Sequence, residues 1–466
     1  MVEKHKEKEQ GKLRRELGLG SVIFFLFGYI VGAGILLQTG TAAAETGPAL
    51  WLAFIIAGIP NVVSAIIIYY IVSAFPVSGG AWVYTSRLLS PFIAFLVLTS
   101  LMIHIIGSLA FISMGFGIYL EGFFSGITYI AAIIILLIFY AINILGVKIA
   151  GWVQIVLAIF GDLLILVLFI IFGLPNISFE NLAGIGDQGL FPQGFLGIFL
   201  GAVILSFSYA GFTAIIEIGG EVKNPKRNIP LGIFISLIMV LILYILVSIV
   251  FTGVFNYTEL STGDNKTIIN VFTQIGIQGG FLIFLNILIL IAIASTIHAV
   301  ILAYSRDLFS AARDRMLPSI LSDVNKKFGT PHWSVSFFCL SALILLIFQP
   351  GYEDLQYLNA LTISVPSLIL AFIPYLLGKK YPELLEKSKF KIKRPYLVIL
   401  VIFNVAYSSL SILAIIGVKW YIVAIVAVLY IVAIIYYFVR KKWLAKKGID
   451  LEEKCSKIPE ETLEVI

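Results

Sequence analysis

Residues 28–36 read GYIVGAGIL and lie early in a long apolar stretch that begins near Ser21. The stretch contains Gly28, Gly32 and Gly34, and each glycine costs a helix about 1 kcal/mol relative to alanine. A helix interrupted in hydrocarbon is tolerated only where it lines a cavity or is buried in protein. The stretch therefore predicts a binding site at a broken membrane helix, or close helix packing through the GxxxG spacing of its first two glycines.

The composition of the chain indicates a membrane protein. Of its 466 residues, 60% are hydrophobic and only 12% are charged, with a mean hydropathy of +1.03. Soluble domains are about 25% charged, so lipid must solvate much of this surface. The basic N-terminal arm leads into a full-length span without a small-residue cleavage site, so we expect no secretory signal. Two cysteines, Cys339 and Cys455, predict no disulfide framework.

Apolar runs between polar breaks predict twelve transmembrane spans. They cover residues 21–44, 48–74, 90–119, 127–146, 151–174, 195–220, 230–254, 279–311, 333–349, 356–378, 396–417 and 420–439.

The distribution of positive charge predicts the orientation. An even number of spans places both termini on one side, and the segments on that side carry 30 Lys and Arg residues. The opposite side carries only Lys266 and Lys419. The positive-inside rule therefore predicts cytoplasmic N- and C-termini, and we expect a multi-pass protein of the plasma membrane.

A second interruption lies in span 6, whose centre is rich in small and polar residues. Spans 1 and 6 each begin a unit of five spans, and an odd number of spans gives the two units opposite topology. Interrupted helices at matching positions of two inverted units are typical of secondary transporters, which favours the binding-site interpretation over packing. The central residues are Ser206, Ser208, Tyr209, Gly211 and Thr213.

This pattern predicts an organisation in five parts. They are a cytoplasmic arm (1–20), a first repeat (21–174), a second repeat (195–378), two further spans (396–439) and a cytoplasmic tail (440–466).

Several motifs together resemble the amino acid–polyamine–organocation (APC) superfamily. They are GYIVGAGI, TGPAL, FPVSGGAWVYTSRLLSP, SYAGFTAIIEIGGEVKNPKRNIP and YSRDLFSAARDRMLP, and they extend over about residues 15–320. The resemblance implies an all-α membrane fold like that of the leucine transporter, with twelve transmembrane helices. In that fold a 5+5 inverted repeat has broken helices 1 and 6, and two C-terminal helices follow.

The resemblance also implies a substrate site. The substrate carboxylate would meet the backbone amides of Ala33 and Gly34, and an α-ammonium would meet the carbonyls of Ile30, Phe207 and Ala210. Free amides at a helix start suit an anion, and free carbonyls at a helix end suit a cation. The expected substrate-binding residues are Ile30, Gly32, Ala33, Gly34, Phe207, Ser208, Ala210, Gly211 and Thr213.

Three residues of span 6 bear on gating and specificity. Phe207 corresponds to a position that is often an aromatic gate, although it could equally be a core or lipid-facing phenylalanine. Thr213 stands where some arginine-exchanging relatives have Glu, which favours a neutral substrate. Glu217 could line the inner vestibule or simply face water.

Asp162 is an ionisable residue in the middle of span 5, and such residues are functional candidates by default. Some proton-coupled relatives have Lys at this place, whereas Ser295 and Thr296 correspond to hydroxyl ligands of sodium in the sodium-coupled branch. Asp162 could therefore carry a proton, bind Na⁺ with both hydroxyls, or bond to a neighbouring helix. We expect H⁺ as the coupling ion, Na⁺ as the alternative, and no other cofactor or metal.

Ionisable side chains elsewhere in the spans are few. His104 and His298 are expected to be satisfied by backbone partners.

The sequence lacks a P-loop, HExxH, paired CxxC or nucleophile elbow, so we expect no enzyme, and no basic-aromatic pattern suggests nucleic acid. The predicted function is secondary active transport of an amino acid or related amine by alternating access, as a proton-coupled symporter. A sodium-coupled symporter, an exchanger of the same fold, or a non-transporting sensor or partner protein are the alternatives. The expected partners are that substrate and the lipid bilayer.

Overall fold

The computed structural model describes residues 18–74, 80–145, 157–185, 189–211, 222–261, 267–325, 330–388 and 390–456. Within these ranges the chain is helical and contains no β-strand, as predicted for an all-α membrane protein.

Six segments of the described chain are long and apolar enough to cross a bilayer. They are Ala33–Ile71, Pro91–Glu121, Arg227–Val254, Gly279–Ile301, Tyr352–Lys380 and Arg394–Lys446. Shorter apolar helices cover Leu19–Ile30, Thr128–Ile144, Gly161–Asn176, Gly194–Tyr209 and His332–Ile347.

The first predicted span is divided into two helices. α1 (Leu19–Ile30) ends in the extended residue Val31, and α2 (Ala33–Thr46) begins after Gly32. The glycine-rich stretch therefore contains the interruption that its composition predicts.

The sixth predicted span also leaves the α-helical conformation near its centre. α10 (Gly194–Leu205) tightens into a 3₁₀ turn, η4 (Ser206–Tyr209), and the chain then becomes extended at Ala210. Gly211 has φ 108°, and a Cβ placed on it would lie 2.5 Å from the carbonyl oxygen of Tyr29. Only glycine combines this conformation with such a close approach.

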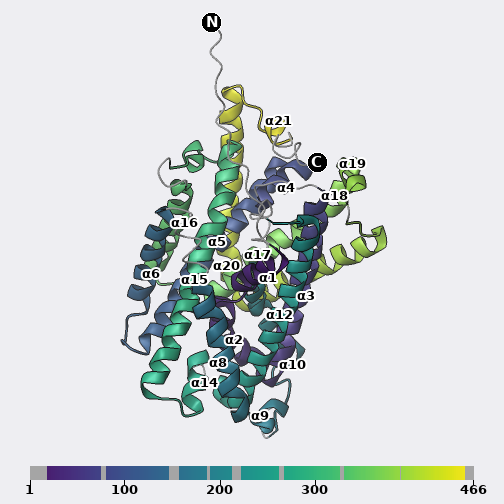
Figure 1. Cartoon of the computed structure of the whole chain (residues 1–466). Coiled ribbons are helices and arrows are strands. Elements are labelled where there is room, and N and C mark those ends of the chain that lie inside the picture. Colours follow the sequence, from purple (N-terminus) through teal and green to yellow (C-terminus); the bar gives the residue numbers. More distant parts are fainter. Residues whose placement is uncertain are drawn as a thin grey trace.

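The remaining helices surround these two broken segments, as Figure 1 shows. The long elements are α3 (Leu50–Ala74), α5 (Pro91–Glu121), α6 (Thr128–Ile144), the π-helical η2 (Ala158–Leu163) with α8 (Leu164–Gly173), α12 (Pro225–Val254), α15 (Gly279–Arg313), α16 (His332–Ile347), α17 (Tyr352–Leu370) and α20 (Arg394–Lys446). The short ones are η1 (Gly47–Ala49), α4 (Gly80–Leu88), η3 (Leu174–Asn176), α9 (Phe179–Ala183), α13 (Tyr257–Ser261), α14 (Ile268–Gln274), η7 (Ser319–Ser322), α18 (Ile373–Lys380), α19 (Pro382–Lys387) and α21 (Leu451–Ser456).

Irregular helix geometry occurs at two places in the last three predicted spans. The span predicted over 356–378 lies within the apolar segment Tyr352–Lys380, which is distorted where α17 ends at Leu370 and α18 begins at Ile373 with Pro374 in its first turn. The predicted gap between the last two spans, residues 418–419, coincides with a kink in α20, where Lys419 adopts non-helical angles (φ −135°, ψ 55°).

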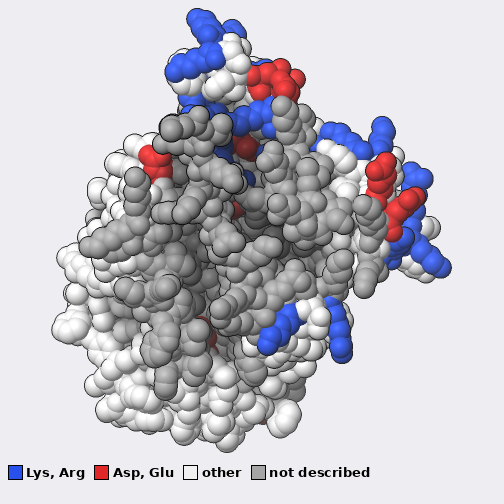
Figure 2. Space-filling view, turned by 45° about the horizontal axis from the view of Figure 1, so that its top comes forward, with Lys and Arg blue, Asp and Glu red and all other residues white. Residues whose placement is uncertain are grey.

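Positive charge gathers at one end of the molecule. α4, α18, α19 and α21 lie at this end, and α9 and α14 lie at the other (Figure 1). Figure 2 looks towards the first end and shows Lys and Arg around it. We call it the basic end.

A buried ion pair holds α4 against the C-terminal end of α15 at the basic end. Arg87 Nη1 lies 2.6 Å from Asp314 Oδ2, and Trp82 Nε1 donates to the same oxygen at 2.8 Å. Arg440 of α20 donates to the carbonyls of Arg315 and Leu317 at 3.0 and 3.1 Å. Polar contacts, rather than apolar packing alone, therefore join the helices here.

The contact between the two broken helices gives a first testable prediction. A Cβ on Gly34 would lie 2.6 Å from Ser208 Cα, so Gly34→Ala must force the two breaks apart. We expect a loss of about 1–3 kcal/mol of stability, measured as a lower melting temperature of the purified protein.

Gly20→Ala is the matched control, because Gly20 is an exposed glycine of α1 with nothing within 4 Å of its Cβ position. It should leave the melting temperature unchanged or raise it slightly. Equal melting temperatures for Gly34→Ala and the unmodified protein would show that the breaks are not closely packed.

Candidate substrate and coupling-ion site

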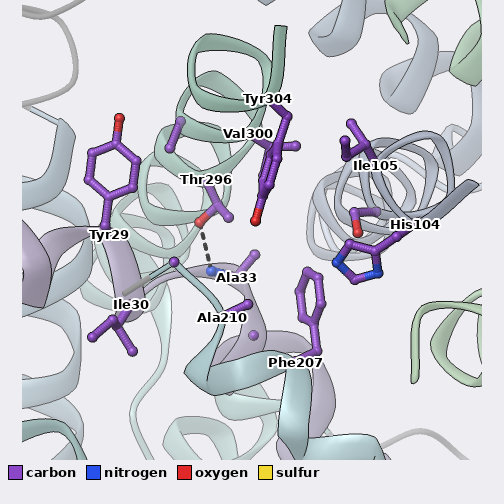
Figure 3. A pocket seen from close by; sticks show the side chains of 14 residues that line it. Tyr29, Ile30, Ala33, His104, Ile105, Phe207, Ala210, Thr296, Val300 and Tyr304 are labelled. Carbon is purple, nitrogen blue, oxygen red and sulfur yellow. Dashed lines mark hydrogen bonds between the residues drawn. The ribbon is translucent and has the colours of Figure 1, made fainter. Parts of the chain in front are cut away.

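A pocket lies against both breaks and is shown in Figure 3. Its empty volume, open mouth included, is about 670 Å³. No Asp, Glu, Lys or Arg lines its described wall. An amino acid in this pocket would therefore rely on backbone groups to hold its charged ends. The lining residues are Tyr29, Ile30, Ala33, Gly34, His104, Ile105, Ser108, Phe207, Ala210, Gly211, Thr296, Ala299, Val300 and Tyr304.

The first turn of α2 begins at the break, and its residues Ala33 and Gly34 line the pocket. The backbone amides of a first turn have no acceptor within their own helix and lie at the positive end of the helix dipole. The Ala33 amide donates to Thr296 Oγ1 at 2.8 Å, as the dashed line in Figure 3 shows. A substrate carboxylate at this amide would therefore have to share it with Thr296 or displace that hydroxyl.

The carbonyls at the helix ends are partly satisfied by α12. The hydroxyl of Tyr244 lies 2.8 Å from the carbonyl oxygen of Ser208 and 3.2 Å from that of Ile30. The Phe207 carbonyl accepts from the Ala210 amide at 3.0 Å. A carbonyl oxygen has two lone pairs, so Ile30 and Phe207 each keep capacity for an ammonium group.

Tyr244 was missed in the sequence, although it is a polar aromatic residue inside the apolar run LILYILV. Its hydroxyl joins the two broken helices. The signal that could have identified it is the presence of a polar hydroxyl within an apolar run.

Two of the predicted substrate-binding residues face the protein rather than the pocket. Ser208 donates its hydroxyl to Gln38 Oε1 at 3.0 Å. The Cβ position of Gly32 is filled by the hydroxyl of Thr296. Both residues therefore support the break and do not line the pocket. Thr213 and Glu217 lie outside the described residues.

Phe207 lies between the pocket and a group of aromatic rings. It packs edge-on against Phe111, with ring centroids 5.8 Å apart, and Phe111 in turn packs against Tyr352 at 4.9 Å. Only 8% of the Phe207 residue surface is exposed. This position agrees with a gate residue, and it also gives Phe207 a packing role.

The three residues predicted for ion coupling meet beside the first break. Asp162 lies in the π-helical turn η2, a distortion often found at functional sites, and its Oδ2 accepts from Ser295 Oγ at 3.1 Å. Its other oxygen, Oδ1, has no hydrogen-bond partner in the described structure. A Cβ on Gly32 would lie 3.8 Å from this oxygen, so the carboxyl group faces the break.

The donor set of this site favours a proton or an alkali cation. The described residues contain no cluster of three or more His, Cys, Asp or Glu side chains that could hold a metal ion. One carboxyl group and two hydroxyls remain. The unpartnered Oδ1 is the atom at which either a proton or Na⁺ would fit.

The two membrane histidines differ in their surroundings. His298 Nδ1 lies 2.9 Å from Asn143 Nδ2, so a side-chain amide is one of its partners. His104 Nδ1 lies 3.2 Å from the Asn359 carbonyl. His104 also lines the pocket, which the sequence did not predict.

Comparison with known proteins identifies relatives along most of the chain. The chain is 28% identical to a branched-chain amino acid permease of Bacillus subtilis over 394 residues, which cover 80% of this chain and 83% of the relative. It is 27% identical to a methylthioribose transporter (89% and 91% covered) and 28% identical to a serine/threonine exchanger (88% and 90% covered), both from Bacillus subtilis.

A family model described as amino acid permease matches residues 17–440. The relatives are transporters and not enzymes, and the apolar helices agree with a multi-pass membrane protein. The match includes both breaks, the pocket and the Asp162 site. This protein therefore belongs to the amino acid permease family of the APC superfamily, as its motifs led us to expect.

Proposed function

We propose that this protein is a secondary active transporter of a neutral amino acid or a related amine, and that it works by alternating access as a proton-coupled symporter. The observation that carries the proposal is an uncharged pocket set between two broken helices, with a buried carboxyl group facing one of the breaks. We further propose the 5+5 repeat, 21–174 and 195–378, with helices 396–439 added.

The proposed orientation places the basic end, with the arm 1–20 and the tail 440–466, in the cytoplasm of a plasma-membrane protein. The support is the concentration of Lys and Arg at that end.

The described wall of the pocket supports a substrate without a charged side chain. Aromatic, aliphatic and hydroxyl groups line it, so a cationic side chain would find no anionic partner among the described residues. Thr213 in place of Glu points the same way. The relatives named for branched-chain amino acids and for serine and threonine agree with this class, whereas others are named as cationic amino acid transporters.

The hydrogen bonds around Asp162 favour a proton over Na⁺. An ionised carboxylate buried with a single hydroxyl donor is expensive, whereas a protonated carboxyl group is neutral. Thr296 already accepts from Ala33 and lies 3.3 Å from the Ala292 carbonyl, to which it donates. In this conformation one of the two hydroxyls needed for Na⁺ is therefore engaged.

A proton on Asp162 would bias the conformational equilibrium. Loss of the proton would leave an uncompensated charge beside the break and would favour any conformation that hydrates it. The proton gradient would thereby drive the change of access, because a ligand shifts an equilibrium by its differential affinity for the two states.

Sodium coupling is the second candidate. The adjacency of the Asp162 carboxyl group and the Ser295 and Thr296 side chains supports it, because hard oxygen ligands lie close together beside Gly32.

Asp162→Asn provides the test of proton coupling. In proteoliposomes we expect uptake driven by a pH gradient to fall at least about tenfold, because asparagine mimics only the neutral form, while exchange of substrate for substrate persists. Asp307→Asn is the matched control, because Asp307 is a buried carboxyl group 11 positions beyond Thr296, about 16 Å along α15.

The outcomes separate the candidates. If Na⁺ rather than H⁺ drives uptake in the unmodified protein, and Ser295→Ala and Thr296→Ala weaken that stimulation, sodium coupling is correct. Asp162→Asn with intact gradient-driven uptake would refute both forms of coupling and leave Asp162 a packing role.

Phe207→Ala tests the gate. Removing the ring opens the aromatic group beside the pocket, so we expect bound radiolabelled substrate to dissociate about tenfold faster or more from proteoliposomes. Phe199→Ala is the control, because Phe199 lies on α10, the helix that leads into η4, and packs against Tyr407 outside the pocket. Equal dissociation rates for Phe207→Ala and the unmodified protein would assign Phe207 to packing alone.

A further inference from the structure

A polar cluster between α5 and α17 borders the pocket and takes no part in the backbone or Asp162 sites. It consists of His104 and Ser108 on α5 and Asn359 and Thr362 on α17, all buried. The two helices approach closely here, since a Cβ on Gly107 would lie 2.9 Å from Asn359 Oδ1. Buried polar side chains within a membrane protein are costly, so this cluster is a candidate for a functional role.

The hydrogen bonds of the cluster determine which nitrogen of His104 carries the proton. His104 Nδ1 lies 3.2 Å from the Asn359 carbonyl oxygen. A carbonyl oxygen can only accept. Thr362 Oγ1 also lies 3.4 Å from Nδ1, but it donates its own hydrogen to the Leu358 carbonyl at 2.7 Å, so the contacts assign the ring hydrogen to Nδ1. In the neutral ring the other nitrogen, Nε2, then has a lone pair and no hydrogen. Among the described residues no hydrogen bond to Nε2 is present.

Ser108 presents a second acceptor. Its hydroxyl hydrogen is donated to Asn359 Oδ1 at 3.2 Å, so its own lone pairs remain. His104 and Ser108 therefore present two acceptors in the pocket lining, whereas the unpartnered donor of the cluster, Asn359 Nδ2, belongs to a residue outside that lining. The wall that His104 and Ser108 form complements a ligand group that donates hydrogen bonds.

His104 is placed where a substrate side chain would lie. Its ring packs against that of Phe207, with centroids 6.0 Å apart, and both residues line the pocket. Figure 3 shows the two rings together, across the pocket from Tyr29 and the first break. A substrate held at the breaks by its backbone groups would direct its side chain to this wall.

We propose that His104 is a specificity-determining residue whose Nε2 accepts a hydrogen bond from the substrate side chain. This selects neutral amino acids that carry a donor, a hydroxyl or a carboxamide, over aliphatic ones of the same shape. The proposal rests on the proposed function and refines its substrate class.

The expected discrimination follows from the burial of the site. An aliphatic side chain against this wall would leave a desolvated acceptor unpaired, which corresponds to about a tenfold to hundredfold loss of affinity. Isosteric pairs of amino acids isolate the effect. Threonine and valine differ by a hydroxyl in place of a methyl group, and asparagine and leucine differ by a carboxamide in place of an isopropyl group.

The experiment uses the full-length protein in liposomes. Uptake is first measured with a panel of labelled amino acids. Threonine, valine, asparagine and leucine are then added as unlabelled competitors, and their inhibition of the uptake of one transported, labelled amino acid is measured. We expect the donor-bearing member of at least one pair to bind at least about tenfold more tightly. A preference within the threonine–valine pair indicates recognition of a hydroxyl, and a preference within the asparagine–leucine pair indicates recognition of a carboxamide.

His104→Phe retains an aromatic ring beside Phe207 and removes the acceptor. It should reduce the preference to within about threefold while valine or leucine binds as before. If the His104→Phe variant does not fold, the His104→Leu variant is used in its place. The matched control is His298→Phe, which changes a buried histidine outside the pocket lining and should leave the preference ratio unchanged.

Each outcome is decisive. Equal affinities within both pairs in the unmodified protein, or a preference that survives in His104→Phe or His104→Leu, would overturn the role of His104 while leaving amino acid transport intact. If no amino acid of the panel is transported or bound, the proposed function itself fails.

Discussion

The structure depends on the direct contact between two interrupted helices in a low-dielectric environment. At this contact Gly34 packs on the backbone of Ser208, and Gly211 packs on the carbonyl of Tyr29. Any side chain at either glycine would separate the helices. The same close approach places the amides at the start of α2 and the carbonyls at the ends of α1 and η4 around one pocket. Packing and binding therefore use the same residues. The glycines thus have both the packing and the cavity role that membrane glycines can have.

Breaking helices in a membrane is possible only if neighbouring helices satisfy the released backbone groups. Here one side chain of α12 and one of α15 do so. Tyr244 of α12 donates to the carbonyls of Ser208 and Ile30, and Thr296 of α15 accepts from the Ala33 amide. Gly32 is needed for the second contact, because the Thr296 hydroxyl occupies its Cβ position. The breaks are therefore stabilised structures with partners, and a substrate must compete with those partners for some of the groups.

Local chemistry explains which parts of this arrangement could be predicted from the sequence. Glycine excess located the first break, and Asp162 was conspicuous as a carboxyl group in an apolar run. Contacts between distant segments could not be predicted, such as the Arg87–Asp314 pair, whose partners are 227 positions apart. Ser208 was expected in the pocket, but its contact with Gln38 depends on how α2 and η4 pack. Residues 212–221 lie outside the described chain, so Thr213 and Glu217 remain predictions.

The proposed substrate and ion sites share a short physical connection. One of the two amides expected to hold the substrate carboxylate is that of Ala33, and its present acceptor is Thr296. The next residue, Ser295, donates to Asp162. A carboxylate that took the Ala33 amide would release the Thr296 hydroxyl beside the unpartnered oxygen of Asp162. Substrate and cation would then alter the same few hydrogen bonds. Coupling between two ligands requires such an element, whose arrangement both of them bias.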